Sequence, residues 1–169
     1  WPVAADGFGF SLVQANPGVS QAPDKGERWR ASAQVAGSPG VDDPAVNIPS
    51  VVINEILTHT DFPQLDAIEL HNPSTNAADI SGWYLTDDPS VPKKYRIPNG
   101  TVPAGGYVYY DETQFNPTPA TTNNFALSSS GESVYLFSAT TNGVLTGYSH
   151  GVVFGASFGL TLPPLVVNR

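Results

Sequence analysis

The chain has 169 residues, of which 40% are hydrophobic and 13% are charged, enough for the buried core of one domain with an appendage. Its 15 acidic residues outnumber 7 Lys and Arg residues, and phosphate backbones and anionic lipids attract basic surfaces, so nucleic acid and membranes are not expected partners. The absence of Cys excludes disulfides and thiolate metal sites, and no apolar run approaches the ~20 residues that span a bilayer.

The first part of the chain contains one predicted strand, at residues 8–14, and a weak pattern at 26–35 that allows a helical turn or two. Residues 36–49 are rich in Pro, Gly and Asp and lack alternation, which is typical of a linker. The chain starts with Trp1 rather than Met, so we expect a piece of a longer protein. Residues 1–40 are then interpreted as the remnant or extension of an upstream module, 41–49 as a linker and 50–169 as a separate domain. An apolar strand near residues 1–12 is expected to pair with an edge of that domain or of another copy.

Short alternating runs with a turn signal about every ten residues follow the linker. They predict strands at 51–58, 67–72, 82–86, 95–97, 107–111, 133–138, 144–149 and 152–154. Asn99-Gly100 and Asn142-Gly143 match the dipeptide of type I′ hairpins, in which both residues have positive φ. This spacing predicts an all-β fold, an antiparallel β-sandwich with an N-terminal extension.

The core of that sandwich is expected around Trp83, a large aromatic that fills the space between two sheets. Gly82 before it is expected to let the chain approach the opposite sheet closely. The predicted core residues are Ile53, Ile68, Leu70, Gly82, Trp83, Leu85, Val134 and Leu136.

Seven sequence segments occur in an order and spacing that resemble a known family. They are INEI at 53–56, DAIELHNPS at 66–74, ISGWYL at 80–85, YRIPNG at 95–100, VPAGGY at 102–107, FAL at 125–127 and GESVYL at 131–136. Together they resemble the lamin tail domain, an immunoglobulin-like module of nuclear lamins that is also widespread in secreted bacterial proteins. The resemblance implies an immunoglobulin-like sandwich whose motifs are architectural. Residues 1–40 resemble the segment that trails a domain in large, multidomain bacterial surface proteins.

One motif matches a catalytic pattern. Residues 147–151 read G-Y-S-H-G, the G-x-S-x-G of a nucleophile elbow, which needs a strand, a sharp turn and a helix. Here the strand-like residues 152–155 follow, and the chain has no Asp, Glu or His after Gly151. We therefore interpret Ser149 and His150 as residues at the end of a strand, and we expect no enzymatic activity.

Metal sites are weighed on two residue sets. A transition-metal site would need His59 and His71 to converge with an acid such as Asp66, and nothing in the spacing requires this. Calcium accepts oxygen ligands from acidic loops, and these carboxylates are Asp42, Asp43, Asp61, Asp66, Asp87, Asp88, Asp111 and Glu112. No EF-hand run is present, so we expect solvated turn carboxylates and no cofactor, with a structural calcium ion as the alternative.

Two further groups of charged residues have binding chemistry. Glu55 and Glu69 lie within predicted strands, where a pair of carboxylates could act on a sugar. Glu55 is interpreted instead as a structural hydrogen-bond acceptor. The basic cluster Lys93-Lys94-Tyr95-Arg96 could neutralise about two or three phosphates, a weak contact that the flanking Asp87-Asp88 opposes.

These patterns favour a non-catalytic structural or interaction module of a larger secreted or cell-surface bacterial protein, used for adhesion, spacing or presentation of neighbouring domains. Its expected partners are other domains of that protein or surface proteins. The alternative is a carbohydrate- or ligand-binding module attached to an extracellular enzyme. Tyr107 and Tyr109 share one face of a predicted strand and Tyr110 the other. A solvent-exposed pair would favour polysaccharide binding, and a buried pair would count against it.

Overall fold

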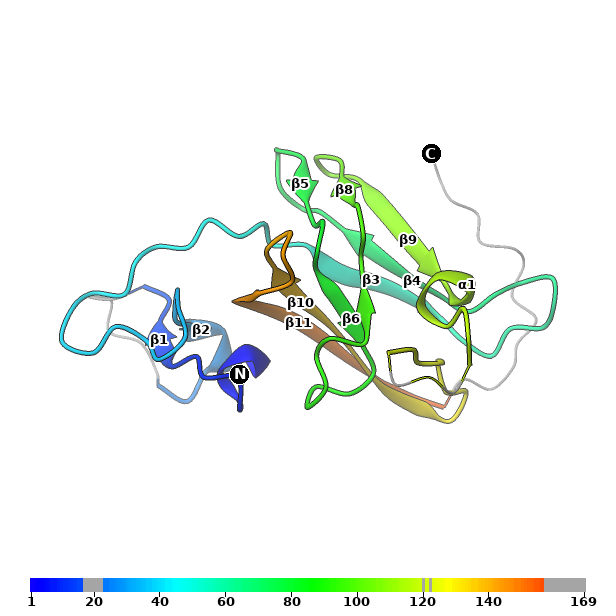
Figure 1. Cartoon of the computed structure of the whole chain (residues 1–169), viewed down its shortest axis with the longest axis horizontal. Coiled ribbons are helices and arrows are strands. Elements are labelled where there is room, and N and C mark those ends of the chain that lie inside the picture. Colours follow the sequence, from blue (N-terminus) through cyan, green and yellow to red (C-terminus); the bar gives the residue numbers. More distant parts are fainter. Residues whose placement is uncertain (17–22, 120, 122, 157–169) are drawn as a thin grey trace.

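The fold is an antiparallel β-sandwich, seen in a computed structural model that describes residues 1–16, 23–119, 121 and 123–156 (Figure 1). One sheet has the order β3-β4-β9, formed by β3 (Val52–Leu57), β4 (Ala67–His71) and β9 (Tyr107–Asp111). The other has the order β11-β10-β6-β7, formed by β11 (Leu145–Gly155), β10 (Gly131–Ala139), β6 (Tyr84–Thr86) and β7 (Tyr95–Arg96). Each strand pairing in the described residues is antiparallel, and the chain adopts the predicted all-β, immunoglobulin-like fold.

Smaller elements connect and flank the two sheets. The two-residue strands β5 (Ala78–Asp79) and β8 (Thr101–Val102) pair with each other, as do β1 (Leu12–Gln14) and β2 (Trp29–Ala31). Three short helical turns complete the set: η1 (Val3–Ala5), η2 (Gly26–Arg28) and α1 (Glu112–Phe115). In α1, the Asp111 carboxylate accepts from the Thr113 amide at 2.9 Å and Gln114 bonds back to the Asp111 amide, a capping box that starts the turn.

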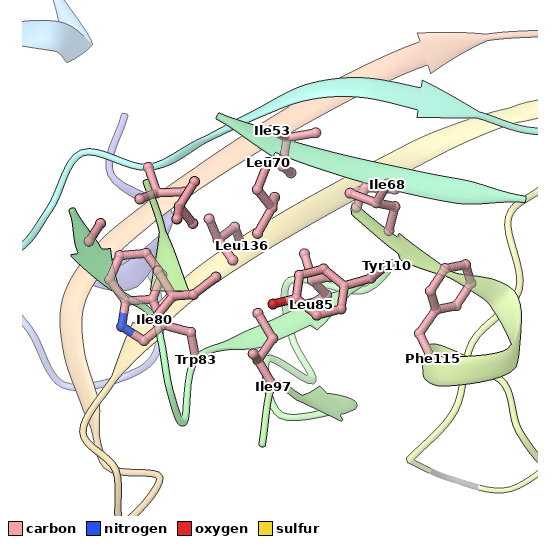
Figure 2. Packing of buried hydrophobic residues seen from close by; sticks show 14 of the residues in the cluster. Ile53, Ile68, Leu70, Ile80, Trp83, Leu85, Ile97, Tyr110, Phe115 and Leu136 are labelled. Atoms are coloured by element: carbon pink, nitrogen blue, oxygen red, sulfur yellow. The ribbon is translucent and has the colours of Figure 1, made fainter. Parts of the chain in front are cut away.

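The core lies between the two sheets, because alternate residues of each strand point inward. In β4, Ile68 and Leu70 are buried while their neighbours are only partly so. Figure 2 shows these two side chains directed toward Leu85 and Leu136 of the other sheet. Of the residues expected in the core, Ile53, Ile68, Leu70, Trp83, Leu85, Val134 and Leu136 belong to this buried cluster.

Trp83 is 3% exposed and packs in this cluster, but Gly82 before it has another role than expected. Gly82 has a φ of +88°, and a Cβ there would lie 2.3 Å from the carbonyl oxygen of Thr140. Thr140 belongs to the β10–β11 hairpin, in the sheet that contains β6. The glycine therefore accommodates a neighbouring hairpin of its own sheet and not the opposite sheet.

Neither Asn-Gly dipeptide forms the predicted type I′ turn. Asn99 and Gly100 have no positive φ, because they connect β7 to β8, two strands that pair with different partners. In the second dipeptide only Gly143 has a positive φ, of 77°. That hairpin is closed by the Thr140 amide, which bonds to the Val144 carbonyl at 2.8 Å.

The two runs predicted at 144–149 and 152–154 are one continuous strand, β11. Gly151 lies opposite Tyr135 of β10 within this strand, and a Cβ at Gly151 would lie 2.5 Å from the Tyr135 ring. The glycine thus makes room for a cross-strand aromatic ring and does not mark a turn.

The N-terminal extension packs on the side of β10 and β11 that faces away from the core, so the expectation that it pairs with a sandwich edge of this chain is wrong. Only residues 12–14 of the predicted strand form β1, and their partner is β2. Phe8 contacts Phe137 of β10 edge to face, with ring centroids 5.7 Å apart. A Cβ at Gly147 of β11 would lie 3.0 Å from the Ser32 carbonyl, so the absence of a side chain there allows the extension to approach closely.

Candidate functional site

The outward side of the β3-β4-β9 sheet displays two exposed aromatic side chains. The alternation of β9 buries Tyr110 in the core and leaves Tyr107 and Tyr109 outside, 51% and 64% exposed. Neighbouring strands add partly buried and charged residues to this side. We define the tyrosine face as Glu55, Glu69, His71, Tyr107, Tyr109 and Asp111.

Strand register arranges these residues in rows across the sheet. Glu55 lies opposite Glu69, which lies opposite Tyr109. In the next row His71 lies opposite Tyr107, and their rings stack with centroids 4.4 Å apart and an interplanar angle of 16°. The stacking pairs Tyr107 with His71, whereas Tyr109 lies next to Glu69, and Glu55 lies one strand further across the sheet.

A hollow of about 580 Å³ lies over part of this face, within the size range of pockets that hold small ligands. Glu55, Leu57, Ala67, Glu69 and Tyr109 contribute to its lining from the three strands. Pro63, Gln64 and Leu65 of the β3–β4 connection line it as well. The hollow thus combines apolar surface with carboxylates.

The charge of the tyrosine face is negative. It carries three carboxylates, and no Lys or Arg of the chain lies on β3, β4 or β9. Asp111 is partly engaged in capping α1, whereas Glu69 accepts one hydrogen bond from the Asn54 side-chain amide at 2.8 Å. A group that binds here must therefore tolerate or neutralise negative charge.

Glu55 does not serve as the structural hydrogen-bond acceptor that the sequence suggested. A register shift between Ile53 and Glu55 inserts Asn54 into β3, and Glu55 is exposed. The bulge changes which residues of the INEI segment face outward, so Asn54 makes the bond to Glu69. Glu55 is left to solvent on the tyrosine face.

The G-x-S-x-G segment forms no nucleophile elbow. Ser149 and His150 lie within β11 and not at its end, which corrects the interpretation from the sequence. The Ser149 hydroxyl accepts a hydrogen bond from the Ala4 amide at 3.4 Å, and His150 Nδ1 accepts one from the Ile53 amide at 3.2 Å. Both side chains hold other segments of the fold in place.

The histidines and acids considered for metal binding are dispersed. In the described part of the chain, no group of three or more His, Asp and Glu side chains is placed to hold a metal ion. His59 lies in the β3–β4 connection and His71 in β4, stacked on Tyr107. Asp66 accepts hydrogen bonds from the amide and hydroxyl of Thr60, at 3.2 and 2.8 Å.

Several of the loop carboxylates considered for calcium bind groups of the chain itself. Asp43 pairs with Arg30 at 2.5 Å and accepts from the Ala33 amide, tying the predicted linker to β2. Asp88 accepts from the amide and hydroxyl of Ser90. These bonds organise turns, as side-chain oxygens of Asp commonly do.

The basic cluster is likewise engaged within the domain. Lys94 pairs with Asp87 at 2.5 Å, and Arg96 donates to the Thr141 carbonyl. The Lys93 ammonium lies 5.8 Å from the ring centroid of Tyr84. Contact with a phosphate would have to compete with these interactions.

Two structural devices were not recognised in the sequence. Asn72 is fully buried, and its amide bonds the 72–76 turn to the carbonyls of Val102 and Pro103. Tyr148 donates its hydroxyl to the Val51 carbonyl at 2.9 Å, and with His150 it closes the seam between β11 and β3. Burial raises the pKa of Tyr148 to about 12, so this donor keeps its proton. The role of Asn72 could have been suspected from the HNPS segment at residues 71–74, because Asn side chains commonly organise turns.

Comparison with known proteins agrees with the architecture. The sequence profile of the Lamin Tail Domain family matches residues 44–151, whereas a search of curated proteins found no match. The matched range spans both sheets of the sandwich and includes the tyrosine face. No helix in the described ranges is long and apolar enough to cross a membrane. The chain belongs to the lamin tail domain family.

Proposed function

We propose that the chain is a non-catalytic interaction module of a larger secreted or cell-surface bacterial protein, and that the tyrosine face is its binding surface. Membership of a family of immunoglobulin-like structural and interaction domains supports the absence of catalysis. The engaged positions of Ser149 and His150 support it as well. The module needs no cofactor for this role.

One observation carries the proposal: Tyr107 and Tyr109 are exposed side by side on a regular sheet. Large aromatic side chains are usually buried, and an exposed group of them marks an interaction surface. Their β-strand backbone holds them in fixed positions, which lowers the entropy that binding costs. The N-terminal extension covers the part of the outward side of β10 and β11 around Phe137 and Leu145, whereas both tyrosines on the β3-β4-β9 side remain open to a partner.

The partners that fit this role are other domains of the same protein or proteins of the cell surface. Residues 1–40 would then connect the sandwich to its parent while packing on it, and the module would present or space its neighbours. Nucleic acid is a poor candidate, because the tyrosine face is acidic and the basic cluster is engaged.

Binding of a polysaccharide for a tethered extracellular enzyme is a second candidate. The specific observation in its favour is that both tyrosines are solvent-exposed on one face of β9, where they would stack on the apolar faces of successive sugar rings. The adjacent Glu69 would accept hydrogen bonds from sugar hydroxyls.

The test compares the chain with a Tyr107→Ala/Tyr109→Ala variant on a panel of immobilised basic, acidic and neutral peptides and of cellulose, chitin and peptidoglycan. We expect the double substitution to weaken binding to at least one panel member by about tenfold or more, a loss of about 1.4 kcal/mol. The control is Val153→Ala, an exposed apolar side chain on β11 outside this face. Binding that is unchanged in the double variant, or lost equally in the control, would contradict the proposal.

A further inference from the structure

We propose that the partner of the tyrosine face is a basic, extended protein segment whose Lys or Arg side chains lie over Tyr107 and Tyr109 and reach Glu55 and Glu69. This inference rests on the function proposed above and names the chemistry of the partner. It is carried by the charge, the aromatic rings and the shape of the face.

The register of β3 and β4 brings two carboxylates together. Glu55 and Glu69 stand directly opposite each other, and like charges in opposite positions destabilise an antiparallel pair. Among the described residues, the one hydrogen bond to the side chains of this pair comes from the neutral amide of Asn54. A cation supplied by a partner would remove the repulsion, so the face is complementary to positive charge.

The two exposed tyrosines of β9 lie near those carboxylates. Tyr109 lies next to Glu69 in the same row and is 64% exposed, so its ring is open to a cation. Tyr107 is held by its stacking on His71 in the adjacent row. Lys and Arg are attracted to the face of an aromatic ring, and Arg also pairs with carboxylates through two parallel bonds. One cationic side chain can therefore use both features at once.

The shape of the face favours a chain segment. The hollow of about 580 Å³ extends from Glu55 and Glu69 to the apolar side chains Leu57 and Leu65. The aliphatic stems of Lys and Arg pack on apolar surface while their charged ends stay with carboxylates. A neutral polysaccharide would use the tyrosines, but it would leave the facing carboxylates without a counter-charge.

The experiment measures binding of a rhodamine-labelled octapeptide of alternating Arg and Thr by fluorescence anisotropy. The Glu55→Gln/Glu69→Gln variant keeps the shape of the face and removes two charges. Its matched control, Asp24→Asn/Asp42→Asn, removes two charges from exposed residues elsewhere. Tyr109→Ala tests the aromatic contribution.

We expect the peptide to bind the unmodified chain, with affinity that falls between about 0.05 and about 0.5 M salt because the attraction is screened. Affinity is expected to fall about tenfold or more in Glu55→Gln/Glu69→Gln and in Tyr109→Ala, and less than about twofold in the control. Removing facing like charges does not weaken the sheet, so a loss in the glutamate variant reports on binding and not on folding.

The opposite results separate this inference from the function on which it rests. Absence of peptide binding, or equal affinities in the glutamate variant and its control, would overturn the basic segment as partner. Binding of cellohexaose that requires Tyr109 but neither glutamate would also overturn it, and would leave the tyrosine face as the binding surface. If Tyr107→Ala/Tyr109→Ala binds every probe as well as the unmodified chain, both proposals fail.

Discussion

Asn72→Ala is expected to destabilise the sandwich more than any exposed substitution, because one buried amide joins a turn to a distant strand. Asn72 is 0% exposed. Its Nδ2 group donates to the carbonyls of Asn76, Val102 and Pro103 at 2.8, 3.1 and 3.1 Å. Its Oδ1 accepts from the amide and hydroxyl of Ser74 at 3.1 and 2.7 Å.

The magnitude follows from the number of bonds that can form at once. Nδ2 carries two hydrogens, so two of its three contacts share one, and Oδ1 accepts two bonds. A net contribution of about 1 kcal/mol for each of these bonds gives about 3–4 kcal/mol for Asn72→Ala. Part of this loss arises because carbonyl groups near β8 are left buried without a donor.

The assay is urea denaturation followed by tryptophan fluorescence, with the slope m checked for equality between variants. Asn76→Ala is the control, because Asn76 is exposed and contributes its backbone to the turn. It is expected to change the free energy of unfolding by less than about 0.5 kcal/mol. A loss below about 1 kcal/mol in Asn72→Ala would refute the view that this amide holds the turn to β8.

Two further predictions concern the N-terminal extension and pH. Phe137 is 1% exposed and contacts Phe8, so Phe137→Ala is expected to lower the free energy of unfolding by about 3–5 kcal/mol and to lower amide protection at Ser32 in hydrogen exchange. The exposed control Val153→Ala is expected to lower the free energy of unfolding by less than about 0.5 kcal/mol. Equal losses of stability in the two variants would contradict the packing of the extension on β10. Burial lowers the pKa of His150 from 6.5, so on acidification the unfolded chain takes up a proton at this residue before the folded chain does. The stability that the neutral, buried imidazole contributes is therefore complete above pH 6.5 and is lost as the pH falls toward the folded-state pKa. His150→Gln keeps an acceptor for the Ile53 amide but does not titrate in this range. We expect its free energy of unfolding to fall less between about pH 7.5 and about pH 5 than that of the unmodified chain. The same fall in both proteins would contradict this account.

Much of the sandwich could be predicted from the sequence, because the alternation in strands such as 67–71 and 107–111 reports directly on burial. The N-terminal extension could not, since only three residues of its predicted strand pair and the rest packs through irregular backbone. The Asn99-Gly100 dipeptide wrongly predicted a hairpin turn, because the flanking strands β7 and β8 pair with different partners. A dipeptide propensity carries no information on which strands become neighbours.

The candidate site was predicted in part. The period of two along β9 placed Tyr107 and Tyr109 on one face and Tyr110 on the other, as the structure has them. The exposure of Glu55 and its position opposite Glu69 depend on a bulge at Asn54 that alternation alone does not reveal.

The most direct test of the tyrosine face as the binding surface is a map of backbone amide chemical shifts in the ¹⁵N-labelled chain, recorded with each member of the panel that binds. We predict that the perturbed amides cluster in β4 and β9, around Glu69, His71, Tyr107 and Tyr109. Perturbations confined to β10, β11 and the N-terminal extension would contradict the account.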